Sequence, residues 1–108
     1  MNRRLLIIVL MACLLPLGMQ AQQGTFRFAQ LTDIHLTPNN PNPTEDLLRS
    51  VAQINATDSI DFVLVTGDLT EEGDRTTMEK VKSCLDLLKV PYHAVLGNHE
   101  TKWSDSGY

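Results

Sequence analysis

The sequence predicts an α/β fold in which a parallel β-sheet is covered by helices. Three apolar runs have the length of strands, and the two segments between them carry apolar residues at helical spacing. The order is therefore strand, helix, strand, helix, strand, which short loops and right-handed crossovers turn into a parallel sheet. The carboxyl ends of all strands then lie at one edge, where open α/β folds bind ligands.

The first strand is predicted in TFRFAQLTD, residues 25–33, where Phe26, Phe28 and Leu31 give the apolar pattern of a strand that ends near Asp33. The next ten residues, IHLTPNNPNP, contain three prolines and three asparagines. Because these residues interrupt regular structure, the segment is predicted to be a loop.

The first helix is predicted to follow this loop. Thr44 stands as its N-cap, and Glu45 and Asp46 come next, where the helix dipole favours acidic side chains. The apolar stripe of this amphipathic helix consists of Leu47, Leu48, Val51 and Ile54.

The second strand is predicted in DFVLVTGD, residues 61–68, a continuous apolar run that Gly67 ends and that is typical of a strand covered on both faces. A second helix is predicted from about Asp74 to Leu88, with Cys84 as a core residue on its apolar stripe. The third strand is predicted in PYHAVL, residues 91–96.

The N-terminus predicts export. Arg3 and Arg4 precede a 13-residue apolar run, which is shorter than the about 20 residues of a membrane span. Small and polar residues follow, so we expect residues 1–21 to be a signal peptide cleaved after Ala21, with a periplasmic or secreted product. A lipoprotein anchored through Cys13 is the alternative, although the residues after Cys13 stay apolar.

Removal of residues 1–21 would leave 87 residues and, without Arg3 and Arg4, change the formal net charge from −4 to −6. An acidic domain is a poor partner for nucleic acid, which requires a basic surface. Cys84 would be the only remaining cysteine, so no internal disulfide is expected.

Polar side chains follow all three predicted strands, in the sequences TDIH, TGDLT and LGNHE. Each one alone is explained by a turn, but the fold brings all three to the same edge of the sheet. Carboxylate, imidazole and amide oxygen together suit a divalent metal such as Mn, Fe or Zn. The candidate site residues are Asp33, His35, Asp68, Asn98, His99 and Glu100.

Asp-x-His, Gly-Asp and Gly-Asn-His-Glu, each at the end of a strand, resemble the motifs of the calcineurin-like metallophosphoesterases. The resemblance covers Phe26 to Glu100. It implies that the chain forms the βαβαβ half of a four-layer α/β/β/α sandwich. It also implies a metal-dependent hydrolase that acts on phosphomonoesters or phosphodiesters.

The resemblance implies a role for each candidate. Asp33 and His35 would bind the first of two divalent metal ions, Asp68 would bridge both ions, and Asn98 would bind the second. His99 would face the substrate and protonate or stabilise the leaving oxygen. Glu100 would orient His99 or a metal ligand by hydrogen bonding. A hydroxide held between the two ions would attack phosphorus in line.

The sequence also departs from this family. The family completes its site with further histidines, whereas this chain has only His35, His93 and His99, and His93 is expected to be a packed or edge residue of the third strand. We therefore expect residues 22–108 to be the N-terminal part of a longer domain, with activity in the complete enzyme and not in this part alone. Glu71 stands where purple acid phosphatases have a tyrosine ligand, which argues against that subgroup, and Thr101 and Lys102 argue against nucleotidases.

Two other functions are compatible with these residues. A non-catalytic metal-binding or interaction module could keep the phosphoesterase fold without the missing histidines. A flavodoxin-like binding domain is disfavoured because no glycine-rich phosphate loop follows the first strand. The substrate, the metal and the oligomeric state are left open by the sequence.

Overall fold

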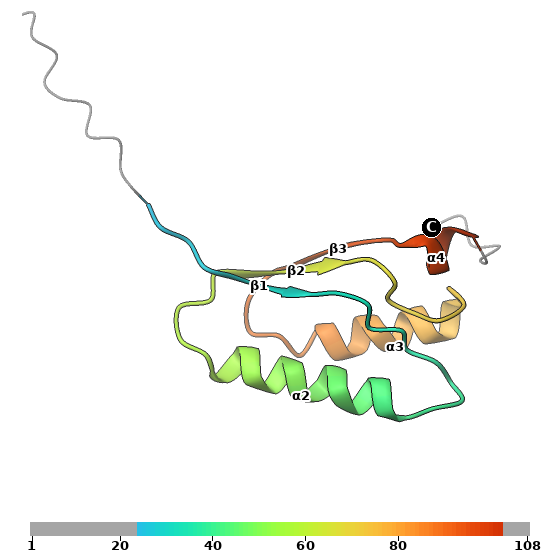
Figure 1. Ribbon diagram of the computed structural model, residues 1–108. Helices are drawn as coiled ribbons and strands as arrows, with labels where there is room; N and C mark the ends of the chain where they lie inside the picture. Colours follow the sequence, from blue (N-terminus) through green and yellow to red (C-terminus); the bar gives the residue numbers. More distant parts are fainter. Residues whose placement is uncertain (1–23, 103–108) are drawn as a thin grey trace, which may run out of the picture.

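The computed structural model describes residues 24–102, which form a three-stranded parallel sheet with helices on one face (Figure 1). The strands are β1 (Phe28–Leu31), β2 (Phe62–Thr66) and β3 (Tyr92–Val95). The helices are α2 (Asn42–Ala56), α3 (Arg75–Leu85) and the short α4 (Asn98–Lys102). This order confirms the predicted α/β fold. The predicted signal peptide and Cys13 lie outside the described residues.

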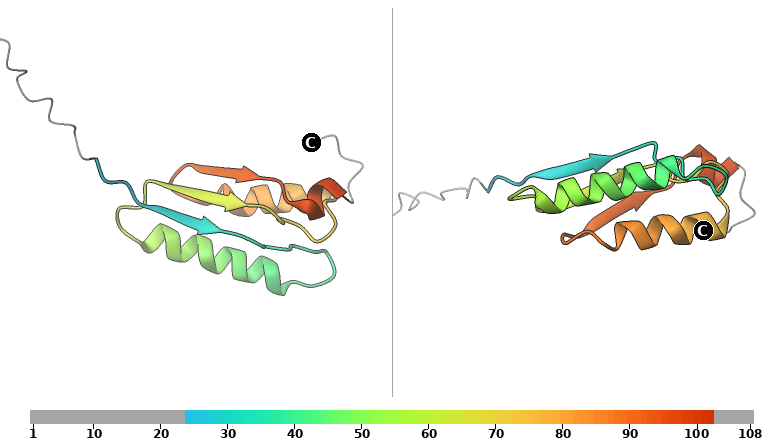
Figure 2. Two further views of the ribbon diagram at one scale, coloured as in Figure 1. Left: turned by 45° about the horizontal axis from the view of Figure 1, so that its top comes forward. Right: turned by 90° about the horizontal axis from the view of Figure 1, so that it is seen from below.

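The strands follow one another across the sheet in the order β1-β2-β3. Because both crossovers advance in the same direction, right-handed connections place both long helices on the same face of the sheet. Figures 1 and 2 show α2 and α3 side by side beneath the strands. The buried apolar residues between the sheet and these helices are Leu36, Leu47, Val51, Val63, Val65, Leu69, Val81, Cys84 and Leu85. The predicted core position of Cys84 is confirmed.

The opposite face of the sheet differs from the prediction that the second strand is covered on both faces. Burial alternates along β2, with Val63 and Val65 buried and their neighbours only partly buried. Within residues 24–102 nothing covers this second face, to which Phe28 and Phe62 contribute stacked rings with centroids 5.4 Å apart. His93 is exposed on the edge strand β3, as predicted.

The predicted N-cap of the first helix is wrong. Helix α2 starts at Asn42, with Pro41 in the cap position and Pro43 in the first turn, where a missing backbone N–H costs nothing. The Asn40 side chain accepts a hydrogen bond from the Asn42 amide at 3.0 Å. Thr44 therefore lies inside the helix, and its buried hydroxyl has no hydrogen-bond partner among the described residues.

Helix α3 begins as predicted, because the Asp74 carboxylate caps it by accepting from the Thr77 amide at 3.0 Å. It ends at Leu85, three residues before the predicted Leu88. Leu88 still packs against the core from the turn that follows. None of the helices in residues 24–102 has the length and apolar character needed to span a membrane.

Candidate functional site

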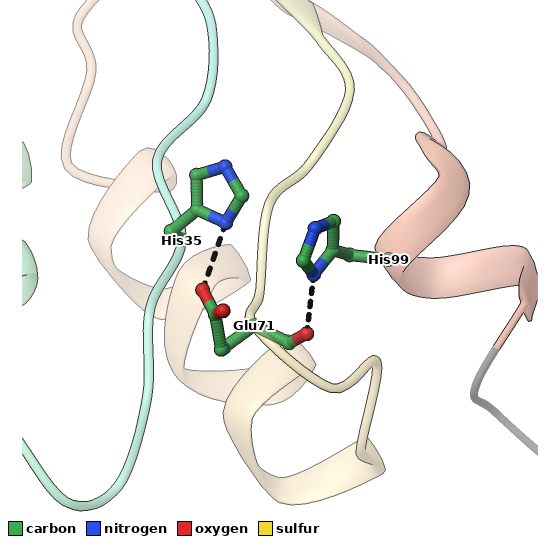
Figure 3. Close-up of side chains that lie close together, drawn as sticks. All are labelled: His35, Glu71 and His99. Carbon is green, nitrogen blue, oxygen red and sulfur yellow. Dashed lines mark hydrogen bonds and ion pairs between the residues drawn. The ribbon is translucent and has the colours of Figure 1, made fainter.

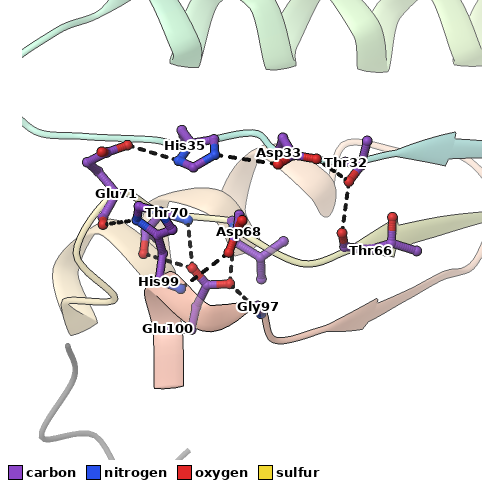
Figure 4. A network of polar contacts seen from close by, with 11 residues as sticks. Thr32, Asp33, His35, Thr66, Asp68, Thr70, Glu71, Gly97, His99 and Glu100 are labelled. Atoms are coloured by element: carbon purple, nitrogen blue, oxygen red, sulfur yellow. Dashed lines mark hydrogen bonds and ion pairs between the residues drawn. The ribbon is translucent and has the colours of Figure 1, made fainter. Parts of the chain in front are cut away.

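The loops after the three strands meet at one edge of the sheet (Figure 4). Backbone hydrogen bonds join them beyond the ends of the strands. The amides of Asp33 and His35 donate to the carbonyls of Gly67 and Asp68, at 3.3 and 2.9 Å, and the Gly67 amide donates to the Val95 carbonyl at 3.1 Å. The sheet edge thus fixes the backbone of the candidate residues from the first two strands.

Three of the candidate residues adopt left-handed backbone conformations. Asp33, His35 and Asp68 have φ values of 53°, 48° and 48°. A residue with a side chain costs of order 1 kcal/mol or more in this region, and such strain is often found at functional sites. The hydrogen bonds between the loops hold these unfavourable conformations in place.

Asp33, His35 and Asp68 each present one donor atom, and these three atoms lie within 4.8 Å of one another. Donors that share a metal ion at about 2.0–2.2 Å lie at most about 4.4 Å apart, so three donors within 4.8 Å of one another need only a small movement to close on an ion. The Nε2 atom of His35 is 3.6 Å from Oδ1 of Asp33, too long for a hydrogen bond but suited to a shared cation. Two carboxylates and one imidazole therefore suit a divalent metal in their chemistry and come close to the spacing that a shared ion requires.

Asn98 is the first residue of α4, and its side chain is exposed at the same edge of the sheet. An amide oxygen is an acceptable ligand for hard and borderline cations. Its place after β3 is compatible with the ligand role that the resemblance implies for it.

His99 is oriented by two hydrogen bonds. Its ring Nδ1 lies 2.6 Å from the backbone carbonyl of Glu71, and its backbone amide donates to Asp68 Oδ1 at 3.2 Å. A carbonyl only accepts, so Nδ1 carries the proton, and Nε2 is the ring nitrogen that can exchange a proton with a substrate. The hydrogen bond to the carbonyl raises the pKa of His99 above its usual value; a smaller effect of desolvation opposes this, and nearby carboxylates add to the increase.

Glu71 is a site residue that the sequence analysis missed, although it had considered this position as that of a possible tyrosine ligand. One oxygen of its carboxylate lies 2.9 Å from Nδ1 of His35, while its backbone carbonyl holds His99 (Figure 3). The rings of His35 and His99 meet edge to face with their centroids 4.7 Å apart. The only sequence signal that pointed to Glu71 is that it is the third residue after Asp68 and belongs to the same loop.

Glu100 is 3% exposed and accepts hydrogen bonds from two segments. Its carboxylate accepts from the amides of Leu69 and Thr70, at 3.0 and 3.2 Å, and from the Gly97 amide at 2.9 Å. These bonds tie the loop that carries Asp68 to the turn that carries His99. Glu100 is thus placed to fix the separation between a candidate ligand and a candidate acid.

Gly97 allows this close approach. A Cβ atom at position 97 would overlap both the backbone nitrogen and the carboxylate of Asp68. Glycine is needed at position 97 because there is no space for a side chain, so the Gly-Asn-His-Glu turn packs directly against Asp68.

An open hollow of about 240 Å³ lies next to Asp33, between the end of β1 and the first turns of α2. Its lining is both apolar and polar and consists of Leu31, Thr32, Asp33, Ile34, Pro43, Asp46, Leu47 and Ser50. The hollow offers room for an organic group beside the candidate metal ligands.

Comparison with known proteins agrees with this geometry. A family model described as calcineurin-like phosphoesterase matches residues 26–108. A protein of Moraxella catarrhalis strain BBH18, named a probable cyclic nucleotide phosphodiesterase, is 35% identical over 77 residues, which cover 70% of this chain and 28% of that protein. Proteins with the same kind of name are 29% identical over 83 residues in Xenorhabdus bovienii strain SS-2004 and 34% identical over 82 residues in Rhodopseudomonas palustris strain ATCC BAA-98 / CGA009. The matches cover 68% and 70% of this chain and 34% and 30% of those proteins, so the chain spans about a third of the length of its curated relatives.

Proposed function

Because the chain belongs to the calcineurin-like phosphoesterase family, we propose that the protein hydrolyses phosphate esters with the help of bound divalent metal ions. The observation that supports this most directly is the convergence of Asp33, His35 and Asp68 within 4.8 Å of one another. His99 contacts both Asp68 and the ring of His35, so a proton donor lies beside the candidate ligands.

Asp33, His35 and Asp68 would hold a first ion, and Asp68 with Asn98 would contribute to a second. Divalent ions in such a site supply two things: they polarise phosphoryl oxygens and lower the pKa of a water molecule that attacks phosphorus. Mn, Fe and Zn all suit this mixture of carboxylate, imidazole and amide donors.

The protein's own groups would then manage the proton and the orientation of the ester. With Nδ1 of His99 held by the Glu71 carbonyl, Nε2 can deliver a proton to the leaving oxygen. The buried Glu100 carboxylate keeps His99 and Asp68 at a fixed separation through the backbone amides that it binds. The hollow beside Asp33 would accept the organic part of the ester.

A phosphodiester of a nucleotide is the substrate class that we test first. The three relatives are named probable cyclic nucleotide phosphodiesterases, but each is matched over only about a third of its length. Phosphomonoesters belong in the same experiment, because the metal ligands and His99 suit either ester.

The test is an assay of the complete enzyme, stripped of metal and then supplied with Mn, Fe(II) or Zn, on 3′,5′-cyclic AMP, bis-nitrophenyl phosphate and nitrophenyl phosphate. We expect metal-dependent hydrolysis that falls at least about 100-fold in Asp68→Asn, since losing a ligand costs more than losing an outer partner of one. Asp58→Asn is the matched control, because Asp58 is an exposed acid in the turn before β2, at the opposite edge of the sheet.

Absence of hydrolysis of all three substrates in a protein that binds the metals would contradict the proposed activity. It would favour the non-catalytic metal-binding module instead. Equal activity of Asp68→Asn and Asp58→Asn would show that the hydrolysis observed does not arise at this site.

A further inference from the structure

We propose that Glu71 is a positioning residue that serves both histidines of the site with different atoms: its carboxylate fixes the ring of His35, and its backbone carbonyl fixes the ring of His99. The inference rests on the proposed function only in treating His35 as a metal ligand and His99 as the proton donor. The two contacts themselves are hydrogen bonds of 2.9 and 2.6 Å.

The contact with His35 determines which nitrogen of that ring can bind a cation. Because the Glu71 carboxylate only accepts, Nδ1 of His35 carries the proton, and Nε2 is left with its lone pair toward Asp33, 3.6 Å away. A carboxylate behind a ligating histidine fixes the tautomer and increases the basicity of the ligand nitrogen. Glu71 therefore fixes the tautomer of His35 that can bind a metal ion even when no metal is bound.

The contact with His99 does not use the Glu71 side chain. The carbonyl belongs to a backbone segment that is held separately, since the Glu71 amide donates to the Leu36 carbonyl at 2.8 Å and Leu36 is 1% exposed. The preceding residue, Thr70, is fully buried and bound to Glu100. Replacement of the Glu71 side chain should thus leave the carbonyl in place.

His35, Glu71 and His99 also lie close enough together to be considered as metal ligands themselves. The hydrogen bonds argue for the positioning role. Both Nδ1 atoms face Glu71, and that of His99 is occupied by a carbonyl, so neither presents its lone pair to an ion between the rings. The edge-to-face ring contact fills the remaining space between them.

The test compares Glu71→Ala and Glu71→Gln with Glu72→Ala in the metal-free protein. Glu72 is the adjacent exposed glutamate, and the Glu71 side chain is itself 51% exposed, so none of the changes disturbs the core. Nitrogen NMR of the imidazoles, at a pH where they are neutral, reports the tautomer of each ring. Calorimetric titration with Mn then gives the metal affinity.

We expect both rings to carry the proton on Nδ1 in the unmodified protein. Glu71→Gln should keep this tautomer at His35, because its amide oxygen still accepts, and Glu71→Ala should lose it. His99 should be unchanged in all variants. Affinity for Mn should fall by about 10- to 100-fold in Glu71→Ala, less in Glu71→Gln, and not at all in Glu72→Ala.

Several results would overturn the proposal. An unchanged His35 tautomer in Glu71→Ala would show that the carboxylate does not set it. A joint change of both rings in that variant would show that the side chain only maintains the loop. Loss of Mn binding in Glu71→Gln as complete as in Asp68→Asn would make Glu71 a ligand.

The tautomers are measured without substrate, so this test is independent of the proposed function. A protein that shows these tautomers but hydrolyses no ester would refute the proposed function and leave the positioning role of Glu71 standing.

Discussion

Asn98 and His99 are adjacent in the sequence, yet their surroundings differ. The His99 ring is held by the Glu71 carbonyl and packs against His35, whereas the Asn98 side chain is exposed at the start of α4. A His99 ring with one nitrogen fixed by a hydrogen bond and the other able to exchange a proton suits proton transfer. An exposed amide oxygen at the edge of the sheet that carries the candidate ligands suits metal binding.

Replacement of His99 by alanine should leave the metal content unchanged and slow the reaction according to the leaving group. General acid catalysis contributes about 10²–10⁴-fold, and a leaving anion that is already stable gains little from protonation. The loss should therefore be large for an alkyl phosphate ester and small for a nitrophenyl ester. Kinetics on the two substrates and elemental analysis of the variant measure this contrast. Equal losses on both, or missing metal, would contradict the acid role.

The variant Asn98→Ala should show the converse behaviour. Losing a ligand weakens the bound ion, so activity should fall and be partly restored by excess Mn, with a similar loss for both kinds of leaving group. Activity measured across a range of Mn concentrations gives the result. A defect that added Mn cannot restore would argue against Asn98 as a ligand.

At the scale of the residue, the motif residues could be identified from the sequence, but the contacts between them could not. The positions of Asp33, Asp68 and His99 after the strands were sufficient to bring them to one edge of the sheet. The double role of Glu71 depends on a backbone carbonyl, which no residue type reveals. The contacts of Glu100 with the Leu69 and Thr70 amides likewise follow from loop geometry.

At the scale of the element, the first residues of α2 and α3 show when a capping residue can be predicted from the sequence and when it cannot. The start of α3 at Asp74 could be predicted, because an aspartate before a helix commonly caps its first turn. In the structure the Asp74 carboxylate accepts this capping hydrogen bond from the Thr77 amide. Thr44 was expected to cap α2 for the same reason, but the two prolines before it already fix helical φ values and begin the helix at Asn42. All three strands are shorter than the predicted segments, since the sequence pattern does not mark where the hydrogen-bonded ladder ends.

The cap of α3 gives a testable stability difference. Asp74 Oδ2 accepts from the amide and hydroxyl of Thr77, at 3.0 and 2.7 Å. Asp74→Ala should lower the free energy of unfolding by about 1 kcal/mol at pH 7, whereas Asp74→Asn keeps a capping side chain and should lose less. Denaturant unfolding of the three proteins measures the difference. Equal stability of Asp74→Ala and the unmodified protein would show that the cap contributes nothing.

The same cap should depend on pH. Burial alone would raise the pKa of Asp74, but the hydrogen bonds from Thr77 outweigh it and the pKa is lowered. A lowered pKa in the folded state means that the contribution is present above the unfolded value of about 3.9 and is lost as the pH falls through the folded value. The stability advantage over Asp74→Asn should therefore shrink in acid, and an advantage that grew in acid would contradict this sign.

At the scale of the whole molecule, the order of strands and helices was predictable and the covering of the sheet was not. The continuous apolar run of β2 is typical of a strand that is covered on both faces, yet burial alternates along it among the described residues. In the described residues α2 and α3 cover one face, and the other presents Phe28, Phe62 and Val95. The expectation of a second covering layer came from this apolar run and agreed with the four-layer fold that the resemblance implies.

Two valines on opposite faces provide the test of this asymmetry. Val65 in β2 is 1% exposed beneath the helices, while Val95 in β3 pairs in register with Thr66 on the open face and is 59% exposed. Both substitutions by alanine remove the same atoms. Val65→Ala should lower the free energy of unfolding by about 2 kcal/mol, from lost burial and the cavity left behind. If the open face is uncovered, as it is among the described residues, Val95→Ala should change it by less than about 0.5 kcal/mol, as at exposed positions in general. Denaturant unfolding of both variants decides the matter, because an equal loss at Val95 would require that something in the protein buries the open face of the sheet.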